Sequence, residues 1–154
     1  MTVPGPVPDR TEAERWGRID ENDERCLELA LPARAELRSL VRMAVSTVAS
    51  NIGFDAETIA DLRLALDELC NACALGATDA SVIRLTFHWS SDGVLVDCSV
   101  SNLAPTRALA DEEDLPQGMR QSELSGNILD ALVDAYGLFA LDGSSRHAWL
   151  RKTS

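Results

Sequence analysis

Three arginines recur at four-residue spacing in the first third of the chain: Arg34, Arg38 and Arg42. Residues four apart share one face of a helix, so these side chains form a basic row beside an apolar stripe. A guanidinium can bind a partner carboxylate through two parallel hydrogen bonds, and this row could make such contacts. The same spacing is typical of an ordinary exposed helix face, on which ion pairs contribute little. The residues alone leave both interpretations open.

A second group of polar side chains interrupts an apolar helical segment further along the chain. The segment LRLALDELCNA at residues 62–72 contains Asp67, Glu68 and Asn71. Asp67 and Asn71 are four residues apart, so a carboxylate and an amide would point to the same side of a helix. The alternative is that the three side chains form the solvated edge of that helix.

Cys70 and Cys73, in the same segment, have a spacing that occurs in metal and redox sites. Such sites lie at turns or at helix N-termini, and no second pair of ligands accompanies this one. The two cysteines are therefore predicted to pack in the core as small hydrophobic residues.

The composition indicates one acidic domain. Hydrophobic residues make up 45% of the 154 residues, which is enough for a core. Acidic residues outnumber basic ones by 25 to 14, giving a net charge of −11. This balance argues against binding to nucleic acid or to anionic lipid. The excess of acidic residues fits binding to a basic partner, or it serves only to keep the protein in solution. No secretory signal or membrane-spanning segment is found, so a cytoplasmic location with reduced cysteines is expected.

The pattern of apolar residues predicts a tail followed by a mixed α and β domain. Residues 1–24 are rich in proline and charge and are expected to be disordered or loosely attached to a domain over 25–154. A strand is predicted over 26–31 and helices over 33–50 and 55–75, with Asp55 as N-cap of the second helix. The first helix is expected to bury Leu37, Leu40, Val41, Ala44, Val45 and Val48.

The second half of the chain predicts two hairpins separated by a long loop and a helix. Alternating apolar residues place strands over 83–89, 94–100, 136–141 and 146–151, and a helix over 123–135. Residues 101–121 show no periodicity, and a loop of this length is functional or disordered. The expected fold is α+β: a two-layer α/β sandwich with a mixed, mostly antiparallel sheet and three helices on one face.

This element order, with the segment at 62–72, resembles the Bergerat (GHKL) fold of the histidine-kinase-like ATPases. The chain is most similar to the anti-sigma-factor serine kinases, especially the divergent actinobacterial type. The resemblance covers about residues 26–152 in element order and is most specific over 33–76. It implies that residues 101–121 correspond to a degenerate ATP lid, that the family's cofactors are ATP and Mg²⁺, and that Glu68 is the general base.

The resemblance also assigns the remaining nucleotide-site residues. The family's metal-binding asparagine lies four residues after the base, which is Ala72 here. Asn71 is then the candidate metal ligand. In one alternative it pairs with Asp67, in a register shifted by one residue. In the other, Glu68 remains the base and Asn71, three residues later, reaches the metal from a slightly different angle. Asn102 stands where the family has an aspartate against adenine, and Gly126 is the one glycine left of a phosphate-binding pair.

In partner binding, the family uses an arginine of the first helix, and Arg42 matches that position. Arg38 and Arg42 are the candidate partner-binding residues, and Arg34 is expected to be an ordinary surface residue. The resemblance implies a homodimer that sequesters an RNA polymerase sigma factor and is regulated by an anti-anti-sigma partner. The alternative is an active ATP-dependent serine kinase that phosphorylates that partner.

Overall fold

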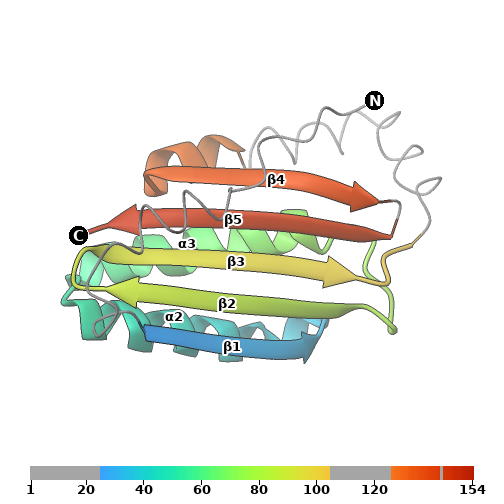
Figure 1. The fold of residues 1–154 in the computed structure, drawn as a ribbon, viewed down its shortest axis with the longest axis horizontal. Coiled ribbons are helices and arrows are strands. Elements are labelled where there is room, and N and C mark those ends of the chain that lie inside the picture. Colours follow the sequence, from blue (N-terminus) through green and yellow to red (C-terminus); the bar gives the residue numbers. More distant parts are fainter. Residues whose placement is uncertain (1–24, 105–125, 143) are drawn as a thin grey trace.

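The computed structural model of the protein describes residues 25–104 and 126–154 except 143, and leaves out the side chains of 139–142. The tail predicted for residues 1–24 and positions 105–121 of the predicted loop lie outside this part. Five strands form one sheet in the order β1-β2-β3-β5-β4 (Figure 1). They are β1 (Arg25–Pro32), β2 (Val82–Ser90), β3 (Gly93–Ser101), β4 (Ala135–Asp142) and β5 (Ser145–Thr153).

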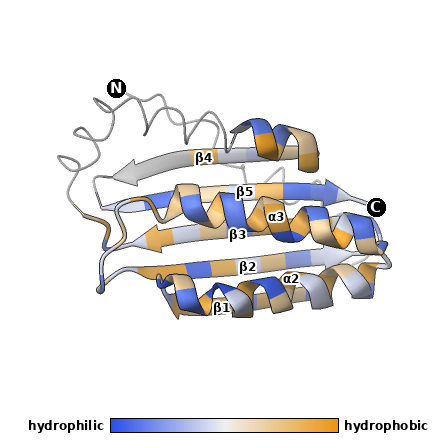
Figure 2. Cartoon of the chain, turned by 180° about the vertical axis from the view of Figure 1, so that it is seen from behind, coloured by the Kyte–Doolittle hydropathy of each residue, from blue (hydrophilic) through white to orange (hydrophobic). Residues whose placement is uncertain are grey.

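The helices lie together on one face of this sheet (Figures 1 and 2). A short 3-10 turn, η1 (Ala35–Leu37), leads into α2 (Arg38–Ile52), which packs on β2 and β3. The longer α3 (Ala56–Cys73) packs on β3 and β5, and residues 126–132 form a further helical segment beside β4. This confirms the predicted α+β, two-layer sandwich. The described strand pairs are all antiparallel, so the parallel part of the expected mixed sheet is not found among them.

A single large core fills the space between the two layers. Each strand turns alternate residues toward the helices, and each helix contributes one apolar stripe. From α2 and α3 the fully buried residues are Val41, Val45, Val48, Ala49, Leu62, Ala65, Leu66, Leu69, Cys70 and Cys73. From the strands they include Leu85, Phe87, Val94, Val96, Cys98, Val100, Ala148 and Leu150. Leu40, expected in the core, is 44% exposed, because the buried stripe of α2 is narrower than its apolar residues suggest.

Both ends of α3 are held by side chains. At the N-terminus, Asp55 is the N-cap as predicted, and its Oδ1 accepts a hydrogen bond from the Thr58 N–H at 2.8 Å. This backbone hydrogen bond lowers the pKa of Asp55 below its ordinary value. At the C-terminus, the buried guanidinium of Arg146 on β5 donates from Nη1 to three carbonyl oxygens, those of Ala72 (2.9 Å), Cys73 (3.2 Å) and Leu75 (2.9 Å).

Several element boundaries differ from those predicted. The helix expected over 33–50 begins with η1 and continues to Ile52, where Gly53 ends it in the left-handed conformation (φ 93°). The helix expected over 123–135 is described only over 126–132, and Ala135 already belongs to β4, paired with Arg151. Backbone pairing with β5 outweighs the helical preference of alanine there. In the described parts, no helix is long and apolar enough to cross a bilayer.

Replacing Arg146 by methionine should destabilise the fold strongly. Methionine keeps an apolar stem of similar length but leaves the three α3 carbonyls without their charged donor. We expect the free energy of unfolding to fall by about 2–4 kcal/mol, measured by urea denaturation followed by circular dichroism. Arg84→Met, on the exposed side of β2, is the matched control and should change it by less than about 0.5 kcal/mol. Equal effects of the two variants would contradict this role of Arg146.

Asp134 should make the stability depend on pH. Its carboxylate accepts hydrogen bonds from the N–H and Oγ1 of Thr153, both at 2.6 Å. Burial raises the pKa of Asp134, but these hydrogen bonds and the charges of Lys152 and Arg151 outweigh burial and hold the pKa below 3.8. A lowered pKa stabilises the folded state above the unfolded-state pKa, and this stabilisation is lost as the pH falls through the folded-state value.

The urea midpoint of wild type should therefore exceed that of Asp134→Asn at about pH 6, and the difference should shrink toward about pH 3. Asp79→Asn, at an exposed position between α3 and β2, serves as the control. A difference between wild type and Asp134→Asn that stays constant over this range would contradict the assignment.

Candidate functional site

The polar residues of α3 that are predicted to do chemistry point in different directions around the helix. Successive helix positions are about 100° apart, so neighbouring side chains point in different directions. Asp67 and Asn71 contact α2, as their hydrogen bonds show. Glu68 and Ala72 are each one position further along, on the flank away from α2. The helical residues 126–132 lie on that side of α3 (Figure 2).

On the α2 flank, two arginines contact the acid and the amide. Arg42 Nε lies 3.1 Å from Asp67 Oδ1 and 2.9 Å from Oδ2, forming an ion pair between the helices. Arg38 Nη1 donates to Asn71 Oδ1 and, at 3.5 Å, to the backbone oxygen of Asp67. The structure therefore brings together four of the predicted site residues: the two candidate partner-binding arginines and two candidate nucleotide ligands.

Further round the helix, Glu68 is partly buried. Ala72, which the resemblance matches to the family's metal ligand, has no side-chain donor atom, and its carbonyl oxygen accepts a hydrogen bond from Arg146. Among the described residues, no group of three or more histidine, cysteine, aspartate or glutamate side chains could hold a metal ion. The positively charged group beside Ala72 is therefore the guanidinium of Arg146, which donates to the Ala72 carbonyl oxygen.

Asn102 follows the end of β3 and is tied to the connection between α3 and β2. It is the one non-glycine residue with a positive φ among those described (58°). Its Nδ2 donates to Ala80 O at 3.2 Å, and its backbone oxygen accepts from the buried Ser81 Oγ at 2.7 Å. Asparagine tolerates this left-handed conformation better than most residues, which accounts for its presence at the turn.

Gly126 lies at the start of the described helical segment, against Tyr136 of β4. The Tyr136 hydroxyl donates to Gly126 O at 3.3 Å, and a Cβ added to Gly126 would lie 3.3 Å from that hydroxyl oxygen. A side chain here would require the tyrosine to shift slightly. The close approach of Tyr136 is a packing contact for which glycine leaves room, independently of any phosphate.

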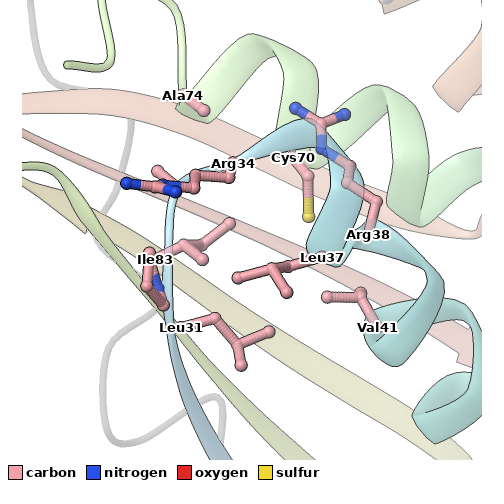
Figure 3. Close-up of a pocket in the computed structure, with 10 residues that line it drawn as sticks. Leu31, Arg34, Leu37, Arg38, Val41, Cys70, Ala74 and Ile83 are labelled. Carbon is pink, nitrogen blue, oxygen red and sulfur yellow. The ribbon is translucent and has the colours of Figure 1, made fainter. Parts of the chain in front are cut away.

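A small apolar pocket opens where β1, η1, α2 and the end of α3 meet (Figure 3). Leu37 and the Cys70 thiol lie inside it, and Arg34 and Arg38 border it. It shares Arg38 with the contact between α2 and α3, but includes none of Glu68, Asn102 and Gly126. The pocket is therefore separate from the candidate nucleotide flank.

Arg146, which binds the end of the acid-bearing helix, is a residue that the sequence analysis missed. A signal was present, because Arg146, Ala148 and Leu150 alternate with outward-facing residues on a predicted strand, and arginine is seldom fully buried. A charged residue at a strand position that faces the core predicts that its side chain is buried and hydrogen-bonded. Its partners could not be inferred, because they are backbone carbonyls over 70 positions earlier in the chain.

Cys70 and Cys73 pack in the core, as predicted, and Cys98 of β3 joins them. Hydrogen bonding with Cys70 and Cys73, together with burial, raises the pKa of the Cys98 thiol well above its ordinary value. All three are free thiols, and Cys26 is exposed on β1.

The fold defines a class of protein, the two-layer α/β sandwich, which is consistent with the resemblance to the histidine-kinase-like ATPases. Curated relatives narrow the class further. The chain is 29% identical over 123 residues to the anti-sigma-F factor RsbW of Mycobacterium tuberculosis, covering 72% of this chain and 73% of that protein. It is 31% identical over 67 residues to the serine-protein kinase RsbW of Halalkalibacterium halodurans, covering 43% and 41%.

No protein-family model matches the chain. The two relatives nevertheless confirm the resemblance that the sequence indicates, because one carries the anti-sigma name and the other the serine-kinase name. The chain is related to the anti-sigma-factor serine kinases of the GHKL group.

Thiol labelling should distinguish Cys26 from the three core cysteines. Thiolate is the reactive form, and burial with a raised pKa suppresses it at Cys98. In the native protein at neutral pH we expect a chromogenic disulfide reagent to label Cys26 rapidly. Cys70, Cys73 and Cys98 should react only after denaturation. Mass spectrometry of labelled peptides assigns the sites, and rapid labelling of Cys98 in the folded protein would contradict the buried cluster.

Proposed function

We propose that the protein is an anti-sigma factor that binds and sequesters an RNA polymerase sigma factor, under the control of an anti-anti-sigma partner. The observation that carries the proposal is the pair of arginines on α2. Arg42 is fixed by its contact with Asp67, yet its side chain stays 46% exposed. A half-exposed, anchored guanidinium on an acidic protein suits recognition of a partner carboxylate.

Binding of the sigma factor is proposed to need no nucleotide. Three of the residues expected to hold ATP and Mg²⁺ are engaged within the protein: Asp67 and Asn71 with arginines, and Asn102 with Ala80. A nucleotide or metal ion would compete with these contacts. The described residues therefore fit the family's ATP and Mg²⁺ site poorly, which favours a scaffold that binds its partner directly.

The alternative is an active serine kinase, and one observation favours it. Glu68, which the resemblance matches to the family's general base, is partly buried on α3. One relative is named a serine-protein kinase. In this alternative, Glu68 would receive the proton of the attacking serine hydroxyl of the anti-anti-sigma partner. We also propose a homodimer, as the resemblance implies.

Titration calorimetry separates the two functions. Each alternative sigma factor of the source genome is purified and titrated with the protein, with and without millimolar ATP and Mg²⁺. We expect one sigma factor to bind without nucleotide, with an affinity that nucleotide leaves unchanged. Arg42→Glu should weaken that binding by about 2–5 kcal/mol. Arg34→Glu is the control, because the structure places Arg34 before η1 in extended backbone and not on the α2 face that carries Arg42; we expect it to bind like wild type.

Two outcomes would overturn the proposal. If no sigma factor binds with or without ATP, the anti-sigma function is wrong. If binding requires ATP, and phosphate transfer to the anti-anti-sigma partner is lost in Glu68→Gln, the kinase alternative is correct. If Glu68→Gln still binds the sigma factor and still releases it to the anti-anti-sigma partner, the nucleotide-independent function is supported.

A further inference from the structure

The contact between Arg42 and Asp67 uses only one edge of the guanidinium. Both carboxylate oxygens approach Nε, at 2.9 and 3.1 Å. Within the residues that the structure describes, no hydrogen bond or ion pair involves Arg42 Nη1 or Nη2. A guanidinium binds a second carboxylate most strongly through two parallel N–H groups, and the pair of Nη atoms provides such an edge.

Burial indicates which partner of this ion pair is fixed. The Asp67 side chain is 21% exposed and that of Arg42 is 46% exposed. Asp67 also lies on a helix held at both ends, by Asp55 and by Arg146. The carboxylate is therefore the anchor, and the guanidinium is the group that it orients toward solvent.

The neighbouring arginine is held by the same helix. Arg38 Nη1 donates to Asn71 Oδ1 and to the backbone oxygen of Asp67, one turn of α2 before Arg42. Two successive basic side chains are thus directed by acceptors that α3 supplies. Arginine side chains that move freely in solution would lose more conformational freedom on binding than these.

Exposed apolar side chains accompany the arginines on the same two helices. Met43, next to Arg42, is 66% exposed, and Leu64, one turn before Asp67, is 47% exposed. Arginine and methionine are enriched at the centres of protein interfaces, where apolar contacts surround a small number of charged ones. This composition fits a partner segment that carries a carboxylate beside apolar residues.

We infer that Asp67 is a positioning residue: it holds the Arg42 guanidinium so that Nη1 and Nη2 receive a carboxylate of the partner protein. This inference rests on the proposed sigma-factor binding and assigns Asp67 to the interface instead of a nucleotide site. Asp67 contributes by ordering Arg42 before the partner arrives. Its own negative charge acts in the opposite direction, because it repels the incoming carboxylate.

Two substitutions at this position separate the two effects. Asp67→Asn removes the charge but keeps an oxygen that accepts from Arg42 Nε. Asp67→Ala removes both the charge and the acceptor. The exposed ion pair contributes little to folding, and alanine favours helix, so both variants should fold like wild type. Asp61→Asn and Asp61→Ala are matched controls on the same helix, because no hydrogen bond or ion pair of the half-buried Asp61 side chain is found among the described residues.

The experiment measures affinity for the sigma factor by calorimetry. Asp67→Ala should bind about three- to tenfold more weakly than Asp67→Asn, the cost of ordering one long side chain on binding. The two Asp61 variants should not differ from each other. If Asp67→Ala binds as tightly as Asp67→Asn, the inference is overturned.

A second measurement tests the positioning in the free protein. In nuclear magnetic resonance spectra, the Arg42 Nε–H of wild type and Asp67→Asn should exchange with solvent more slowly than that of Asp67→Ala. Equal exchange in wild type and Asp67→Ala would overturn the positioning role even if a sigma factor binds. If no sigma factor binds wild type, the proposed function fails together with the partner side of the inference, and the exchange rates still decide whether Asp67 orders Arg42.

Discussion

A buried positive charge must be surrounded by acceptors, and in this protein that requirement fixes α3 on the sheet. Arg146 satisfies its guanidinium with the carbonyl groups that the end of a helix leaves unpaired. The negative end of the helix dipole lies at the same place, so the charge and the dipole stabilise each other. The Asp55 cap stabilises the first turn of α3, and the hydrogen bonds of Arg146 fix the other end of the helix relative to β5.

The orientation of α3 decides which of its polar residues meet. Because Leu62, Leu66 and Leu69 face the sheet, Asp67 is directed toward α2, and Glu68 points about 100° further round the helix. The Asp67 side carries the interhelical contacts with the arginines. The position that the resemblance matches to a metal ligand is alanine here. These contacts are the physical basis for favouring partner binding over nucleotide chemistry.

Local patterns in the sequence predicted the fold well. Alternation identified the hairpin strands, helical periodicity identified α2 and α3, and Asp55 was recognised as a cap, because each signal depends on residues near one another. Leu40 and Ala135 were misplaced, because neither the width of a buried stripe nor the competition between a helix end and a strand is a local property. The resemblance supplied Glu68 and Arg42 as candidates. Spacing within one helix could not show that Asp67 and Asn71 would meet Arg42 and Arg38, since the paired residues lie on two helices and are 25 and 33 positions apart in the sequence.

The strand order has a consequence for synthesis of the chain. β1, β2 and β3 pair with neighbours that are consecutive in sequence, so this half of the sheet can form as the polypeptide leaves the ribosome. β4 pairs only with β5, and β5 also covers the open edge of β3, so both wait for the last strand to emerge. Until then, β3 exposes an unpaired edge and α3 lacks Arg146, which arrives on the same strand. The nascent domain therefore passes through a stage in which a chaperone, or a second chain with a free edge, can compete for the place of β5.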